Sequence, residues 1–243
     1  MTEVDGTLTV LGPGARSTSL VPLEEVPLTL AGISSHNIQN AMAAASAALG
    51  AGLPEAAVVS GLKSFVLDEE TNPGRANLYE LEGRVVVLDF AHNEAGLKGM
   101  IEVCRGLRPP RGEIWLSFCT AGDRSNTILH GMGYIAGRGS DHVAIAELTH
   151  YLRGRDRQEL IDRLRAGAVD AGVTDVPVFP DELHALQWML EASRPSDLVA
   201  VAALSQRSEL FAYLRERGAS RVGPKRVRQL VRQSRGKARA AAG

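Results

Sequence analysis

Two short segments carry side chains that could bind a charged ligand. Arg75 follows a Pro-Gly pair, so a turn holds its backbone, and its guanidinium offers a planar fork of donors that suits phosphate. The residues Asp-Phe-Ala-His-Asn occupy positions 89–93, directly after the apolar run at 85–88. Ligands of α/β proteins bind at the carboxyl ends of such strands. The two segments therefore predict a site that combines a cation with an anion; a surface arginine on a linker is the plain alternative.

The aspartate of the second segment has two interpretations. The carboxylate of Asp89 only accepts hydrogen bonds, which suits a ribose diol or a charged amine. It could equally cap the helix that follows, because aspartate is common at that position. His92 and Asn93 share the turn, and an isolated histidine is more often a structural hydrogen-bonding group than a catalyst. The residues alone support ligand contact and helix capping equally.

A third polar cluster opens a predicted helix. His36, Asn37 and Asn40 stand at the start of the alanine-rich stretch 36–50, a composition that favours helix. Asn37 and Asn40 are three positions apart, so they share one helix face. Amide groups carry a donor and an acceptor together, as the edge of an adenine requires. The cluster could contact a nucleotide base, but from the residues alone capping with a polar surface is the favoured interpretation.

These residues need a framework of alternating strands and helices. Apolar strands spaced by amphipathic helices predict an α/β fold, with a Rossmann-like, mostly parallel sheet and helices on both faces. The predicted strands lie at 78–81, 85–90, 114–118, 142–146, 176–179 and 198–202. The predicted helices lie at 94–107, 126–137, 157–171 and 181–193.

A smaller unit is expected before the sheet. Short strands are predicted at 7–11, 19–23 and 26–30, with a Gly-Pro-Gly turn at 12–14, and helices at 36–50 and 54–65. The polar, turn-rich stretch 68–74 follows, and we place a domain boundary there. A small strand-plus-two-helix segment therefore precedes the sheet.

Composition limits the class of protein. The 243 residues are 44% hydrophobic and 23% charged, enough to bury a full core in one or two domains. No apolar run reaches the roughly 20 residues of a membrane span, and the first residues do not look like a signal peptide, so a cytoplasmic location is expected. Cys104 and Cys119 lie in apolar contexts and receive no chemical role. The histidines lack metal-ligand spacing, and no metal site is expected in this chain.

The formal net charge of −1 hides a basic end. Residues 221–243 contain eight basic residues and no acidic one. Such a segment could bind polyanions, but it has no aromatic side chains to stack on bases. A solvated, frayed terminus is therefore favoured over a nucleic-acid-binding arm.

Together, the Pro-Gly-Arg turn, the Asp-x-Ala-His-Asn segment and the His-Asn-x-x-Asn-Ala-x-Ala-Ala helix start resemble the Mur ligase family. The resemblance is to the C-terminal, glutamate-ligase-type domain plus the end of the ATP-binding central domain, and it is strongest to cyanophycin synthetase. The turn at 122–124 also resembles a Gly-Asp-Arg turn of that enzyme; a turn with a local Asp-Arg pair is the alternative.

The resemblance implies an ATP-dependent enzyme that joins a carboxylate to an amine through an acyl phosphate. It also implies that the arginine of the Pro-Gly-Arg turn swings onto ATP with the C-terminal domain. The residues that it implies are, for catalysis, Arg75, Asp89 and His92; for ATP, His36, Asn37, Asn40 and Asn93; and for the incoming amino-acid or peptide substrate, Gly122, Asp123 and Arg124.

The Gly-x-x-x-x-Gly-Lys-Ser/Thr phosphate loop does not occur in the sequence. We therefore expect the chain to be the C-terminal part of such a ligase, inactive alone, with Mg²⁺ held mainly by parts that it lacks. A partner polypeptide would then supply the loop. Residues 1–70 would be a remnant of the central domain, 71–220 the C-terminal domain, and 221–243 a disordered basic tail. The alternative is a degenerate, non-catalytic module that binds a nucleotide or peptide.

Overall fold

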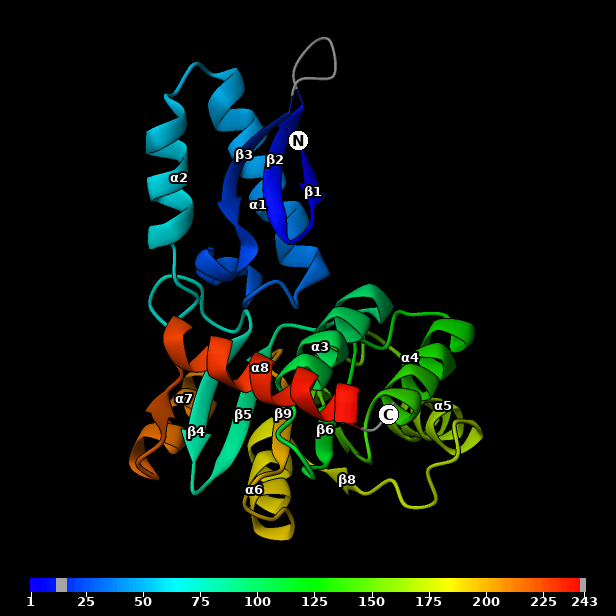
Figure 1. Ribbon diagram of the computed structural model, residues 1–243. Helices are drawn as coiled ribbons and strands as arrows, with labels where there is room; N and C mark the ends of the chain where they lie inside the picture. The colour runs from blue at the N-terminus through cyan, green and yellow to red at the C-terminus, as the bar shows by residue number, and fades with distance from the viewer. Residues whose placement is uncertain (12–16, 241–243) are drawn as a thin grey trace.

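The computed structural model describes residues 1–11 and 17–240, and a seven-stranded sheet forms the larger part of the protein (Figure 1). The strand order is β10-β4-β5-β9-β6-β7-β8. Strands β5, β9, β6, β7 and β8 are parallel, whereas β4 and β10 extend one edge in antiparallel pairings. Their bounds are β4 (Asn77–Leu81), β5 (Arg84–Asp89), β6 (Ile114–Phe118), β7 (His142–Ala146), β8 (Val178–Phe179), β9 (Leu198–Ala202) and β10 (Ser220–Arg221).

Helices cover both faces of this sheet. Val85 and Val87 of β5 point to one face, in a core shared with α3, α4, α5 and α8, and Val86 and Leu88 point to the other, against α6 and α7. This arrangement confirms the predicted fold class. The helices are α3 (Glu94–Leu107), α4 (Asn126–Gly139), α5 (Arg157–Asp170), α6 (Glu182–Ala192), α7 (Arg207–Glu216) and α8 (Pro224–Ala240), with a 3-10 turn η4 (Thr149–Tyr151).

The N-terminal segment has its own small core. An antiparallel sheet of three strands packs with two helices around Leu8, Val21, Ala41 and Val58. The elements are β1 (Thr2–Val4), β2 (Thr7–Leu11), β3 (Ser17–Pro22), α1 (Ser35–Gly50) and α2 (Glu55–Ser64). The turn expected at 12–14 lies outside the described residues.

The prediction of a strand at 26–30 is wrong. The chain forms the 3-10 turns η2 (Leu23–Glu25) and η3 (Pro27–Thr29) there. The buried hydroxyl of Thr29 donates to the carbonyl oxygens of Leu23 at 2.7 Å and Val26 at 2.9 Å, and these local bonds favour a turn over a strand.

The expected disordered tail is also wrong over residues 224–240, which form α8. Val227, Leu230 and Val231 recur at helical spacing and are all at most 4% exposed, because they pack into the core on the α3 side of the sheet. Only residues 241–243 of the expected tail lie outside the described part.

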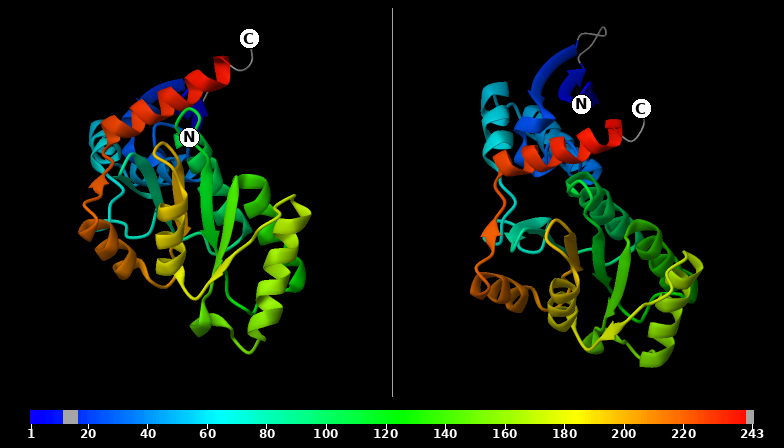
Figure 2. Two further views of the ribbon diagram at one scale, coloured as in Figure 1. Left: turned by 90° about the horizontal axis from the view of Figure 1, so that it is seen from below. Right: turned by 60° about the horizontal axis from the view of Figure 1, so that its bottom comes forward.

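Helix α8 also reaches the N-terminal segment. In both views of Figure 2 the red helix lies next to the blue and cyan N-terminal elements, and Arg228 donates to the carbonyl oxygen of Glu24 at 3.3 Å. Ser35 at the start of α1 donates to Glu102 of α3 at 2.5 Å, a second contact between the two parts. Within the described residues, the helices are too short or too polar to cross a membrane.

Candidate functional site

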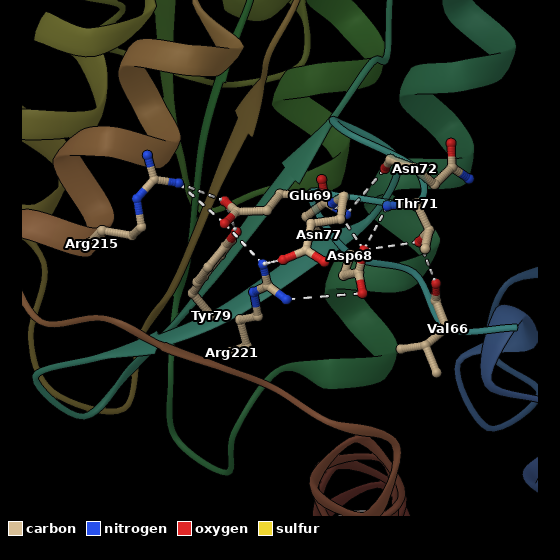
Figure 3. Close-up of polar contacts among 10 residues, drawn as sticks. Val66, Asp68, Glu69, Thr71, Asn72, Asn77, Tyr79, Arg215 and Arg221 are labelled. Atoms are coloured by element: carbon tan, nitrogen blue, oxygen red, sulfur yellow. Dashed lines mark hydrogen bonds and ion pairs between the residues drawn. The ribbon is translucent and has the colours of Figure 1, made fainter. Parts of the chain in front are cut away.

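A network of side-chain hydrogen bonds shapes the turn that carries Arg75. The Asn77 amide accepts from the Gly74 N–H at 2.6 Å and donates to the Asn72 carbonyl at 3.2 Å (Figure 3). Gly74 has φ +73, a backbone conformation that glycine adopts without strain. These bonds therefore fix the backbone that carries the exposed Arg75 relative to the start of β4.

Residues 68–74 form the linker that leads to this turn, and charged groups bind the linker to the sheet (Figure 3). Glu69 accepts from Tyr79 and Arg215, both at 3.1 Å, and from Arg221 at 2.9 Å. Although burial raises the pKa of Glu69, the hydrogen bonds from Arg221 and Tyr79 lower it overall. Asp68 accepts from the Thr71 N–H at 2.7 Å, and this bond lowers its pKa. These bonds thus fix the linker and the Arg75 turn to the sheet domain.

Asp89 lies at the carboxyl end of β5 and bonds the same turn. Its Oδ2 accepts from the Ala76 N–H at 2.8 Å. Burial raises the pKa of Asp89 to about 6, and the bond from Ala76 and the nearby Arg75, His36 and His92 oppose that rise. A carboxylate so placed is ionised less readily than an ordinary aspartate.

The helix-capping interpretation of Asp89 is wrong, because Asn93 caps α3. The Asn93 Oδ1 accepts from the Gly96 N–H at 2.8 Å, and its Nδ2 lies 3.4 Å from the His92 Nε2. The His92 Nδ1 lies 3.2 Å from the Phe90 carbonyl, and the His92 carbonyl accepts from the Thr120 hydroxyl at 2.9 Å. His92 is therefore held by its own turn and by the loop after β6.

One pocket of about 890 Å³ unites most of the predicted residues. It lies between α1 and α2 on one side and the Arg75 turn, the end of β5 and the start of α3 on the other. Its lining includes the apolar side chains of Leu28, Leu62 and Phe65. The predicted residues that line it are His36, Asn37, Asn40, Arg75, Asp89, His92 and Asn93.

The other three predicted residues lie outside this pocket, in the loop after β6. Asp123 pairs with Arg153, which lowers the Asp123 pKa. Arg155 donates to the carbonyl oxygens of Gly122 at 2.7 Å and Arg124 at 2.8 Å. A Cβ on Gly122 would lie 2.1 Å from a backbone oxygen of the neighbouring loop, so only glycine fits there. The local Asp-Arg alternative therefore describes part of this turn, because Asp123 lies 3.9 Å from Arg124.

Comparison with known proteins decides the family. The domain family described as "Mur ligase, glutamate ligase domain" matches residues 74–204, which is more than half of the chain. This chain belongs to the Mur ligase family. The match begins at the Arg75 turn and ends just after β9, so it covers the sheet that positions the pocket.

Two relatives show how much of a Mur ligase is present. The UDP-N-acetylmuramoyl-L-alanyl-D-glutamate--2,6-diaminopimelate ligase of Alkalilimnicola ehrlichii is 31% identical over 179 residues, which cover 73% of this chain and 34% of that protein. The cyanophycin synthetase of Geminocystis herdmanii is 30% identical over 182 residues, which cover 73% of this chain and 20% of that protein. The chain thus spans about a third or a fifth of the length of these relatives, and both kinds are similarly close.

A solved structure shows that the fold extends beyond the matched domain. E. coli FolC in complex with DHPP and ADP superposes with a TM-score of 0.63 at 18% identity, over 89% of this chain and 46% of that one. At this identity the likeness is one of fold. It includes part of the N-terminal segment, because 89% exceeds the share that the sheet domain alone contributes.

Sequence reasoning did not single out two residues at the edge of the pocket, Phe90 and Arg207. The Cζ of Arg75 lies 4.8 Å from the centroid of the Phe90 ring, and the Cζ of Arg207 lies 5.3 Å from it. Arg207 begins α7, just after the carboxyl end of β9. That position at the ligand-binding edge of the sheet was the available signal.

The described residues do not form a cluster of metal-ligating side chains. Over residues 1–11 and 17–240, no three His, Cys, Asp or Glu side chains converge as metal ligands.

Proposed function

We propose that this chain is the C-terminal part of an ATP-dependent ligase that joins a carboxylate to an amine, of the Mur and cyanophycin synthetase type. One observation supports it above all: α1, the linker and β5 bring the seven predicted catalytic and nucleotide-binding residues to one pocket. Residues 1–70 would be the end of the ATP-binding central domain, and 71–220 the C-terminal domain. Helix α8 extends the C-terminal domain.

The amides on α1 suit the base of ATP. The Asn40 Nδ2 donates to the Asn37 Oδ1 at 3.3 Å. Within the described part of the chain, this bond leaves the Asn37 NH₂ and the Asn40 oxygen at the pocket for the donor and acceptor of an adenine edge. His36 and Asn93 line the same pocket and complete the proposed nucleotide set.

Arg75, Asp89 and His92 form the proposed catalytic set. In the reaction, a carboxylate oxygen of the first substrate attacks the γ-phosphorus of ATP and ADP leaves. The amine then attacks the acyl carbon, and phosphate leaves with the bonding electrons. The Arg75 guanidinium would stabilise the negative charge on the transferring phosphoryl group, and Asp89 and His92 would position the nucleotide beside it.

The incoming amine would approach from the loop after β6. Gly122, Asp123 and Arg124 stand there, at the same edge of the sheet as Asp89. Because Arg153 and Arg155 brace this loop, it offers a rigid surface for the amino-acid or peptide substrate.

The chain would not turn over ATP alone. The 243 residues contain no phosphate loop, and we place that loop in another part of the enzyme. Mg²⁺ accompanies ATP in such reactions and offsets phosphate charge. We assign no residue of this chain to it.

Calorimetry with ATP, together with an assay of phosphate release, tests this function. We expect the purified chain to bind ATP without releasing phosphate. Release should begin only when a polypeptide that carries the phosphate loop and both substrates are added. Turnover by the chain alone, at the rate of an intact ligase, would refute the proposal.

A third result would favour the non-catalytic alternative. ATP binding that persists while every combination with loop-bearing partners stays inactive is expected of a degenerate nucleotide-binding module. Arg75→Gln separates the two in a second way, because a ligase should lose turnover far more than it loses affinity for ADP.

A further inference from the structure

We propose that Arg207 and Arg75 together form a two-guanidinium oxyanion site across the Phe90 ring, in which Arg207 extends the nucleotide pocket toward the incoming substrate. This inference rests on the proposed ligase function and adds a residue and a charge preference to it. The ligand is an oxyanion. It belongs either to the terminal phosphate of the nucleotide or to a carboxylate of the second substrate, which share this chemistry.

The two guanidinium groups share one aromatic platform. Their Cζ atoms lie 4.8 Å and 5.3 Å from the centroid of the Phe90 ring. They are therefore no more than about 10 Å apart, a distance comparable to the Debye length of about 8 Å at physiological ionic strength. Two exposed cations at this distance repel each other, and an anion that contacts both removes that cost.

Other arginines of α7 and α8 are paired with carboxylates of the linker, β4 and the β4–β5 turn. Arg215 bonds Glu69 in the linker network (Figure 3), Arg217 bonds Glu82 at 2.7 Å, and Arg226 bonds Glu80 at 2.7 Å. Over residues 1–11 and 17–240, neither Arg75 nor Arg207 forms an ion pair with a carboxylate. The pair therefore keeps its donors for a ligand.

The backbone that carries Arg207 is preorganised. The buried carboxylate of Glu182 accepts from the N–H groups of Leu204 at 2.7 Å, Ser205 at 3.0 Å and Gln206 at 2.8 Å. Arg207 then occupies the first position of α7, where the helix dipole disfavours a cation and favours an anion. The hydrogen-bonded loop therefore holds the start of α7 in one position, and a binding site needs such preorganised support.

The Arg207 side chain also touches the turn that carries Arg75. Its Cδ lies 2.6 Å from where a Cβ on Gly74 would be, so its stem rests on that glycine. The two cations are thus positioned by one contact between the linker turn and the loop after β9.

The strand order gives the direction of the extended site. β9 lies between β5 and β6, so the loop that leads to Arg207 starts between the ends of those strands, and the contacts of Arg207 with Gly74 and Phe90 place it beside the Arg75 turn. Arg75 and Phe90 line the nucleotide pocket, whereas Arg207 lies just beyond it. An oxyanion held there would lie at the edge of the proposed nucleotide pocket, where the loop after β9 begins.

Calorimetry on the full chain tests the pair with four probes: adenosine, ATP, inorganic tripolyphosphate and sodium L-aspartate. The variants are Arg207→Gln, Arg75→Gln and the double variant. Arg163→Gln is the matched control, because Arg163 is an exposed arginine on α5, away from the pocket. Melting curves confirm that each variant folds.

If the pair binds phosphate, Arg207→Gln weakens ATP and tripolyphosphate about tenfold, the loss expected for one charge-assisted hydrogen bond, and leaves adenosine unchanged. If it binds the carboxylate, the aspartate affinity falls instead. In either case the double variant loses less than the product of the single losses, because both side chains hold one anion.

Two failures are distinguishable. ATP binding that is equal in wild type and Arg207→Gln, with tripolyphosphate and aspartate also unchanged, overturns the oxyanion pair and leaves the ligase proposal standing. A wild-type chain that binds none of the four probes overturns both. A loss as large in Arg163→Gln as in Arg207→Gln would reduce the effect to net charge and also count against the pair.

Discussion

Replacing Asp89 by asparagine tests the electrostatics of the site most directly. The folded protein holds the Asp89 pKa at about 6, above the ordinary value of 3.8, because burial penalises the charged form. Ionised Asp89 therefore destabilises the fold. The penalty is absent below the unfolded-state pKa, grows as the pH rises from 3.8 toward 6, and is complete above it. The two pKa values set an upper limit of about 3 kcal/mol.

Asparagine removes the charge and keeps the oxygen that accepts from the Ala76 N–H. We therefore expect Asp89→Asn to match the wild type in unfolding free energy near about pH 4 and to exceed it by about 1 to 3 kcal/mol near about pH 7. Urea denaturation followed by the fluorescence of Trp115 and Trp188, at several pH values, measures the difference. Asp175→Asn, at an exposed loop aspartate, is the control and should give a constant difference.

A difference that stays flat across this pH range would refute the reasoning, because it would mean that Asp89 has an ordinary pKa in the folded chain. A wild type that gains on the variant as the pH rises would refute it more strongly. In that case the charges of Arg75, His36 and His92 would outweigh burial.

Three further changes probe the supports of the site. Asn77→Ala should cost about 1 to 3 kcal/mol in urea denaturation and speed hydrogen exchange at the Gly74 N–H, whose acceptor it removes; unchanged exchange would show that the turn holds without it. Glu182→Gln should cost a similar 1 to 3 kcal/mol or so, since an NH₂ would face backbone N–H groups, and unaltered stability would count against that network. Leu230→Ala should lower the unfolding free energy by about 2 to 5 kcal/mol, with Arg232→Ala costing under about 1 kcal/mol as the control, and equal losses would show that α8 is not held by its apolar side.

The sheet was predictable because its strands are continuous apolar runs bounded by turns. Residues 85–88 are the clearest case, and the predicted strand at 85–90 differs from β5 by one residue at each end. The stretch at 26–30 has the same apolar character, but the Thr29 hydroxyl bonds nearby carbonyls and closes a turn. Helix α8 was missed because its three apolar positions are diluted among basic residues, and only packing against α3 shows their use.

The site was predictable where a motif marked it. The residues on α1, the linker and β5 are far apart in sequence, and only the resemblance to a family grouped them before the structure did. Capping was not predictable, since Asp89 and Asn93 are both good caps and only the backbone geometry selects Asn93. Arg207 belongs to no motif, so its neighbourhood with Phe90 required coordinates.

The carboxylate network of the linker determines where this protein can bend. Asp68, Glu69 and Asn77 bond residues 68–77 to β4, α7 and β10. This stretch therefore forms one rigid body with the sheet. The Val66 carbonyl also accepts from the Thr71 hydroxyl at 2.7 Å and Leu67 packs against the main core, so the fastened stretch extends back almost to the end of α2. A rotation of the N-terminal segment would therefore bend the chain near Phe65 and break the Ser35–Glu102 and Arg228–Glu24 contacts, while the Asp89–Ala76 bond keeps the Arg75 turn at the end of β5. The proposed catalytic residues Arg75 and Asp89 would keep their relative positions during such a rotation, and only α1, with the proposed base-binding amides, would move relative to them.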